Sequence, residues 1–153
     1  MVARTRLASQ DDSKARLRFW LHLLKATRHM EAEIKDRLRL EFDTTLPRFD
    51  VMAALEKSGA GLKMSQLSKQ LMVSNGNVTG IVDRLVTDGL VVRVSIKGDR
   101  RATLVRLTLK GETRFSHMAR AHQDWVAELL RRVDDTEISL ASEVFCKIRD
   151  ITS

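Results

Sequence analysis

Polar side chains that can bond to another molecule gather in residues 71–90, LMVSNGNVTGIVDRLVTDGL. Asn can hydrogen-bond to base edges, Thr offers a hydroxyl and a methyl group, and Arg serves a guanine edge or a phosphate. The alternative is an ordinary solvated helix face, which is more often made of Glu and Lys. We therefore predict a nucleic-acid-reading helix, whose candidate contact residues are Ser74, Asn75, Asn77, Thr79 and Arg84.

The spacing of apolar residues predicts the helix that carries these side chains, from Asn75 to Asp88, with Gly89 ending it. Ser74 is the predicted N-cap, and the backbone N–H groups beside it favour a phosphate. One apolar stripe should seat the helix on its domain; it consists of Val78, Ile81, Val82, Leu85 and Val86.

A β-hairpin with a charged tip is predicted directly after this helix. Residues 90–96 and 102–108 are rich in β-branched side chains, and KGDRR separates them. Residues 72–110 carry seven basic and three acidic side chains, or +4 of the chain's net +7. Lys97, Arg100 and Arg101 are therefore candidates for a minor groove, which attracts inserted arginine. Asp99 is expected to hold Arg101 by a charge-assisted hydrogen bond; the alternative is a solvated charged turn.

Helices account for the rest of the chain. A long one is predicted over about 14–42 with Ser13 as N-cap, and another begins near Pro47. A short helix is expected at 64–71, a long one at about 109–133 with Thr108 as N-cap, and a last one that starts with DDTE. The order predicts a mainly α fold with a small β-hairpin wing: a winged helix-turn-helix lobe and a helical body. The buried side of the last helix is expected to be Ile138, Leu140, Ala141, Val144, Phe145 and Ile148.

Composition argues against several other classes of protein. One cysteine, Cys146, excludes an internal disulfide framework; its apolar neighbours predict a buried, inert thiol, with redox sensing as the alternative. No apolar run approaches the roughly 20 residues that span a bilayer, and the charged N-terminus is unlike a signal peptide. We expect a cytoplasmic protein without membrane contact. No catalytic constellation, metal-ligand spacing or phosphate-binding glycine loop occurs, so no enzyme, metal or cofactor is expected.

The sequence resembles the MarR-type (multiple-antibiotic-resistance regulator) winged-helix transcription factors, above all in VSNGNVTGIVDRLVTDGLV, DRRA and VRLTLKG. The resemblance implies a homodimer on double-stranded, pseudo-palindromic operator DNA, with helices in major grooves and wings in minor grooves. It implies one domain over 1–153, with a winged lobe at about 46–110 and dimerisation helices at about 13–43 and 109–151. Many relatives have Thr-Arg where this chain has Thr79 and Gly80, so its base reading is expected to differ.

The resemblance also implies a small phenolic or carboxylic effector between the dimer body and the DNA-binding lobe. FWLHLLKATRHMEAEIKDRLR looks like the branch that senses aromatic acids or their acyl-CoA thioesters. The candidate effector residues are Trp20, Phe49, Met52 and Phe115, with Arg37 and Arg39 for CoA phosphates. The alternatives are ordinary core for the apolar residues and a solvated face for the arginines. The leading hypothesis is a ligand-released repressor; the rival is a winged-helix module that binds a protein.

Overall fold

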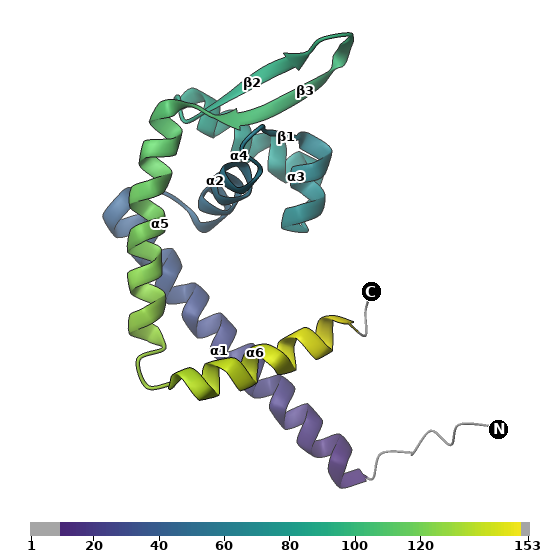
Figure 1. Cartoon of the computed structure of the whole chain (residues 1–153), viewed down its shortest axis with the longest axis vertical. Coiled ribbons are helices and arrows are strands. Elements are labelled where there is room, and N and C mark those ends of the chain that lie inside the picture. Colours follow the sequence, from purple (N-terminus) through teal and green to yellow (C-terminus); the bar gives the residue numbers. More distant parts are fainter. Residues whose placement is uncertain (1–9, 151–153) are drawn as a thin grey trace, which may run out of the picture. The chain divides into compact units, whose positions relative to one another are not determined.

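A computed structural model describes the backbone of residues 10–150 and their side chains, except those of Gln10, Arg100 and Arg101. Within residues 10–150, six helices and three strands follow one another (Figure 1), which confirms the predicted mainly α fold with a hairpin. They are α1 (Gln10–Phe42), α2 (Leu46–Ser58), β1 (Leu62–Lys63), α3 (Met64–Leu71), α4 (Asn75–Thr87), β2 (Val91–Ile96), β3 (Asp99–Leu107), α5 (Leu109–Leu129) and α6 (Asp135–Asp150).

The chain divides into two compact units, with the boundary between Thr45 and Leu46. Within the described residues the first unit is the single helix α1. This helix already includes Ser13, so the prediction that Ser13 caps its start is wrong. Asp11 and Asp12 lie in its first turn, where carboxylates interact favourably with the helix dipole, and this accounts for the earlier start.

A three-stranded antiparallel sheet in strand order β1-β3-β2 lies in the second unit. Strands β2 and β3 form the predicted hairpin, with Arg93 opposite Val105 and an irregularity between Ser95 and Ile96. Strand β1 was not predicted, because two residues give no period and Leu62 becomes a strand only by pairing with Val105. The sheet thus attaches the base of the hairpin to the segment before α3.

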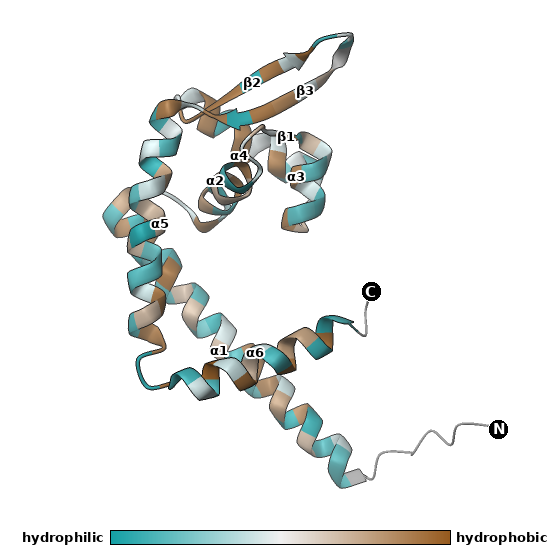
Figure 2. Ribbon diagram, in the orientation of Figure 1, coloured by the Kyte–Doolittle hydropathy of each residue, from teal (hydrophilic) through white to brown (hydrophobic). Residues whose placement is uncertain are grey.

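The core of the second unit brings α2, α3 and α4 together beneath the sheet, and the strands β2 and β3 are apolar along much of their length (Figure 2). Its most deeply buried side chains are Val51, Met52, Leu67, Val78, Val82, Leu85, Val91, Val105 and Met118. Gly111 allows α5 to start against this core, because a Cβ atom there would lie 1.9 Å from the carbonyl oxygen of Leu90. Helix α5 ends at Leu129, four residues earlier than predicted.

Helix α6 has no buried residue, although its apolar residues recur on one side. The expected burial of that side is therefore wrong for a single chain: Val144, Phe145 and Ile148 are 39%, 42% and 47% exposed. Cys146 is also exposed, which contradicts the predicted buried thiol. None of the helices within residues 10–150 is long and apolar enough to cross a membrane.

Candidate nucleic-acid interface

Helix α4 begins with the predicted serine cap. The Ser74 hydroxyl accepts a hydrogen bond from the Asn77 backbone N–H at 3.4 Å. The turn before it contains Met72 in a left-handed conformation (φ 53°), and its side chain is 93% exposed. The Ser68 hydroxyl donates to the Val73 carbonyl at 2.6 Å and ties the turn to α3. The start of α4 is thereby fixed against the preceding helix.

The predicted apolar stripe seats α4 on the core through most of its members. Val78, Val82 and Leu85 are buried, and Ile81 is half-buried. Val86, the remaining member, is exposed, so its predicted burial is wrong. Val86 follows Val78 by eight residues, which at about 3.6 residues per turn places it to one side of the stripe and not at its centre.

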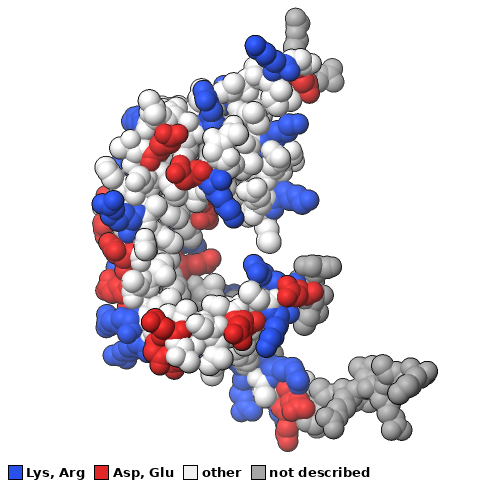
Figure 3. All heavy atoms as spheres, viewed as in Figure 1, with Lys and Arg blue, Asp and Glu red and all other residues white. Residues whose placement is uncertain are grey.

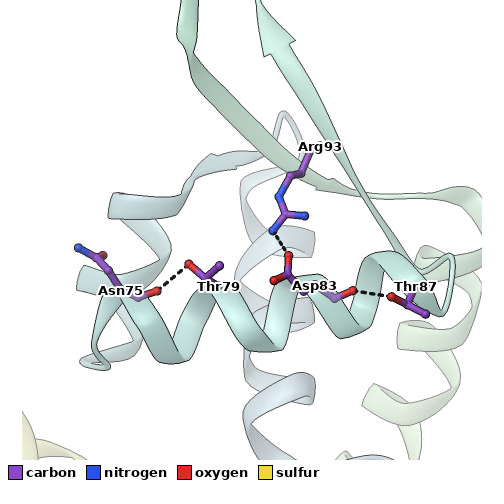
Figure 4. Close-up of polar contacts among 5 residues, drawn as sticks. All are labelled: Asn75, Thr79, Asp83, Thr87 and Arg93. Atoms are coloured by element: carbon purple, nitrogen blue, oxygen red, sulfur yellow. Dashed lines mark hydrogen bonds and ion pairs between the residues drawn. The ribbon is translucent and has the colours of Figure 1, made fainter.

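One exposed row along α4 consists of Asn75, Thr79, Asp83 and Thr87, four residues apart (Figure 4). The Thr79 hydroxyl donates to the Asn75 carbonyl at 2.8 Å, and the Thr87 hydroxyl donates to the Asp83 carbonyl at 3.0 Å. The predicted contact residues Asn75, Asn77 and Thr79 are all exposed on this helix. Most side chains on the outer surface of α4 are therefore small, polar and accessible.

An ion pair connects α4 to the hairpin: Arg93 Nη2 on β2 lies 2.5 Å from Asp83 Oδ1 on α4 (Figure 4). We did not predict this pair. The available signal was two opposite charges ten residues apart, on the two sides of the turn at Gly89. A second pair joins Arg84 to Asp88 at 3.5 Å, so this predicted contact residue is already near a carboxylate.

The hairpin tip turns at Gly98, whose φ of 90° few other residues adopt, and Lys97 beside it is exposed. Asp99 is exposed as well. The predicted bond from Asp99 to Arg101 lies outside the described side chains, as do the contacts of Arg100. On the face drawn in Figure 3, lysine and arginine side chains outnumber carboxylates over the hairpin and the helices beneath it.

Several hydrogen bonds join the C-terminal end of α4 to the first turn of α5. The Thr108 hydroxyl donates to the Gly89 carbonyl at 2.7 Å and accepts from the Gly111 N–H at 3.0 Å, which confirms Thr108 as the α5 N-cap. The Thr108 N–H donates to the Leu90 carbonyl at 3.1 Å. Lys110 Nζ donates to the Asp88 carbonyl at 2.9 Å. We refer to the three bonds that end on the carbonyls of Asp88, Gly89 and Leu90 as the α4–α5 joint.

The candidate effector residues fall into both units. Phe49 and Met52 belong to the buried core of the second unit, and Phe115 is half-buried. The Phe49 ring lies 5.5 Å from the Phe115 ring and 4.9 Å from the His122 ring, centroid to centroid. This aromatic cluster joins α2 to α5, a structural role that accounts for its residues without a ligand.

The candidates on α1 are accessible. Trp20 is 53% exposed, and Arg37 is half-exposed. Arg39 lies 3.8 Å from Asp36 on the same exposed face. That pair matches the alternative of a solvated face with ion pairs at helical spacing.

Known proteins are similar to this chain over different parts of its length. The MarR family model matches residues 44–103. The crystal structure of a MarR family transcriptional regulator from Silicibacter pomeroyi matches this chain with a TM-score of 0.81 and 34% sequence identity. The match covers 95% of this chain and 100% of that one. The transcriptional regulator PecS of Dickeya dadantii is 28% identical over 104 residues, 67% of this chain and 63% of PecS. This chain thus spans slightly less than two thirds of the length of PecS.

A mutant of E. coli MarR, solved in complex with operator DNA, has a TM-score of 0.74 at 24% identity, covering 92% of this chain and 98% of that one. At this identity the likeness concerns the fold alone. The regulator from Silicibacter pomeroyi carries the assignment, because its identity extends over its whole length. The chain belongs to the MarR family of transcriptional regulators.

Proposed function

We propose that this protein binds double-stranded operator DNA, with α4 in the major groove and the hairpin against a neighbouring minor groove. The observation that carries the proposal is the outer face of α4, where Asn75, Asn77 and Thr79 stand exposed beside a basic hairpin. Carboxamides and the hydroxyl and methyl groups of threonine suit base edges, whereas arginines and lysines also contact phosphates. The Ser74-capped start of α4 supports a phosphate contact there as well.

The direct test is binding of the purified protein to DNA from upstream of its own gene, measured by fluorescence anisotropy at several salt concentrations. We expect preference over a shuffled duplex, and a log affinity that falls linearly with log salt, by roughly 0.9 for each phosphate neutralised. Equal binding to both duplexes at moderate salt would exclude a sequence-specific regulator. Binding to neither would favour the alternative of a winged lobe that contacts a protein.

We propose further that two chains assemble into a homodimer that binds a pseudo-palindromic site as a repressor. The unburied apolar side of α6 supports an interface, because accessible apolar surface of this extent on a helix usually marks one. Trp20, Leu17 and Leu21 on α1 are similarly exposed and could join it. A dimer presents two copies of α4, which matches two half-sites.

The proposed effector is an aromatic carboxylate or its CoA thioester, suggested by the resemblance of α1 to that branch of the family. Within the proposal, Trp20, Phe49, Met52 and Phe115 contact the aromatic group, while Arg37 and Arg39 contact phosphates. The test is a thermal-shift screen of aromatic acids and their CoA thioesters, repeated as release of bound DNA. Stabilisation by free acids alone would remove Arg37 and Arg39 from the proposal, and unchanged DNA affinity would remove the repressor mechanism.

A further inference from the structure

We infer that Thr79 reads a thymine through contact between its own γ-methyl group and the thymine 5-methyl group, and that its hydroxyl donates no hydrogen bond to a base. This inference rests on the proposed binding of α4 in the major groove and specifies what one position there recognises. It starts from the bond that the Thr79 hydroxyl already makes within the helix, to the Asn75 carbonyl oxygen at 2.8 Å (Figure 4).

That bond uses the only proton of the hydroxyl group. To donate to a base, Thr79 would have to break it and rotate, and a buried interface would then leave the carbonyl of Asn75 with one partner fewer. The oxygen points along the helix toward Asn75, and the methyl group is on the other side of the branched Cβ atom (Figure 4). Thr79 therefore offers an approaching surface its methyl group, together with an oxygen that can accept a hydrogen bond but has no proton left to donate.

The neighbours of Thr79 leave this methyl group open. Gly76 and Gly80, three residues before and one after, are exposed, and apart from their chain neighbours and the helix backbone no atom lies within 4 Å of the position a Cβ would occupy. Neither has a positive φ, so the helix backbone does not require glycine at these positions. Their effect is to remove side chains from both flanks of Thr79, so that another surface can come close.

The carboxamides near Thr79 are suited to a different kind of contact with a base. Within the described part of the chain, the carboxamides of Asn75 and Asn77 make no hydrogen bond and remain able to donate and accept. The thymine 5-methyl is the one apolar group on a base edge in the major groove, and threonine methyl groups suit it. We therefore assign hydrogen-bonding readout to the two asparagines and thymine readout to Thr79.

The experiment compares two substitutions that separate the two groups of threonine. Thr79→Val keeps a methyl group in place and removes the hydroxyl, whereas Thr79→Ser keeps the hydroxyl and removes the methyl. Each protein is titrated with the operator found in the DNA upstream of its gene. It is also titrated with a series of variants of that operator, each with deoxyuridine, which lacks only the 5-methyl, in place of one thymine in each half-site. Thr87→Val and Thr87→Ser are the matched controls, because Thr87 makes the same bond two turns further along α4.

We expect one thymine position at which deoxyuridine weakens wild-type binding by about four- to tenfold, the range for losing about one buried methyl contact. Thr79→Val should keep both the affinity and this sensitivity. Thr79→Ser should bind about four- to tenfold more weakly and lose the sensitivity at that position alone. The two Thr87 variants should match the wild type.

Other outcomes overturn the inference. Wild-type affinity in Thr79→Ser with loss in Thr79→Val would assign the readout to the hydroxyl, and equal loss in both would mean that neither group suffices. No position sensitive to deoxyuridine, or sensitivity unchanged in Thr79→Ser, would exclude the methyl contact while leaving DNA binding intact. If the wild type has no sequence preference at all, the proposed function fails first and this inference fails with it.

Discussion

At the scale of single residues, Gly111 and Gly80 both lie in helices but differ in the space around them. A Cβ at Gly111 would lie 1.9 Å from the Leu90 carbonyl oxygen, whereas nothing lies within 4 Å of one at Gly80. Gly111→Ala should therefore displace the first turn of α5 and lower the free energy of unfolding by roughly 2 kcal/mol or more. Gly80→Ala should raise it by about 0.5–1 kcal/mol, because alanine favours a helix interior. Urea denaturation of both variants tests this contrast, and equal effects would refute it.

His122 provides a second prediction at this scale. Burial beside Phe49 lowers the pKa of His122 below its ordinary value, and the nearby Asp50 carboxylate only partly opposes this effect. The unfolded chain thus binds a proton on His122 more readily than the folded chain does. Its contribution to stability should be complete above about pH 6.5 and decline as the pH falls from there toward the lowered pKa.

The measurement is the melting temperature between pH 7.5 and 5.5 for the wild type and for His122→Gln. We expect the wild type to lose more stability over this interval than the variant loses. His117→Gln is the matched control, because His117 lies on the same helix with an exposed side chain. The prediction is wrong if the two pH profiles of wild type and His122→Gln run parallel.

At the scale of elements, the Asp83–Arg93 pair fixes the hairpin relative to α4. The two side chains are 59% and 34% exposed, so the pair should contribute only about 0–1 kcal/mol to stability. Its importance should appear in DNA binding. Asp83→Asn removes a negative charge, which by electrostatics alone would strengthen binding to DNA. If the pair positions the hairpin, operator affinity should instead fall by roughly two- to fivefold.

Asp88→Asn is the control for this prediction, because it removes the same charge from the end of α4 and releases Arg84. Its operator affinity should stay the same or rise. Tighter binding by both variants would show that Asp83 acts through its charge and not by positioning the hairpin.

The elements differ in whether the local sequence predicts them. The extent of α4, its Ser74 cap and the hairpin follow from local periodicity and capping chemistry, and the structure confirms them. Strand β1 and the Asp83–Arg93 pair depend on segments meeting in three dimensions, which no local pattern encodes. The wrong predictions for α6 and Cys146 share one cause: an apolar stripe indicates a surface suited to burial, but it does not specify whether the same chain buries that surface.

At the scale of the whole molecule, the proposed homodimer would cover the exposed apolar side of α6. If a second copy does, Ile148→Glu should place an unpaired charge in the interface and weaken the dimer by roughly a hundredfold. Ser139→Glu adds the same charge nine residues earlier, on the opposite and polar side of the helix, and should leave the dimer intact. Sedimentation velocity over a range of concentrations distinguishes the two variants. A monomeric wild type, or unaltered assembly of Ile148→Glu, would contradict the proposed interface.

The α4–α5 joint has a consequence for how such a molecule can be controlled. Its bonds run from Thr108 and Lys110 to the backbone carbonyls of residues 88–90. The bonds therefore do not depend on which side chains are present at the end of α4. Because these bonds connect the two helices at one point, a tilt of α5 must also move the end of α4. In a dimer the distance between the two α4 helices then becomes a function of the angle of α5. A ligand that never contacts the winged lobe could thus retune the half-site spacing that the protein accepts.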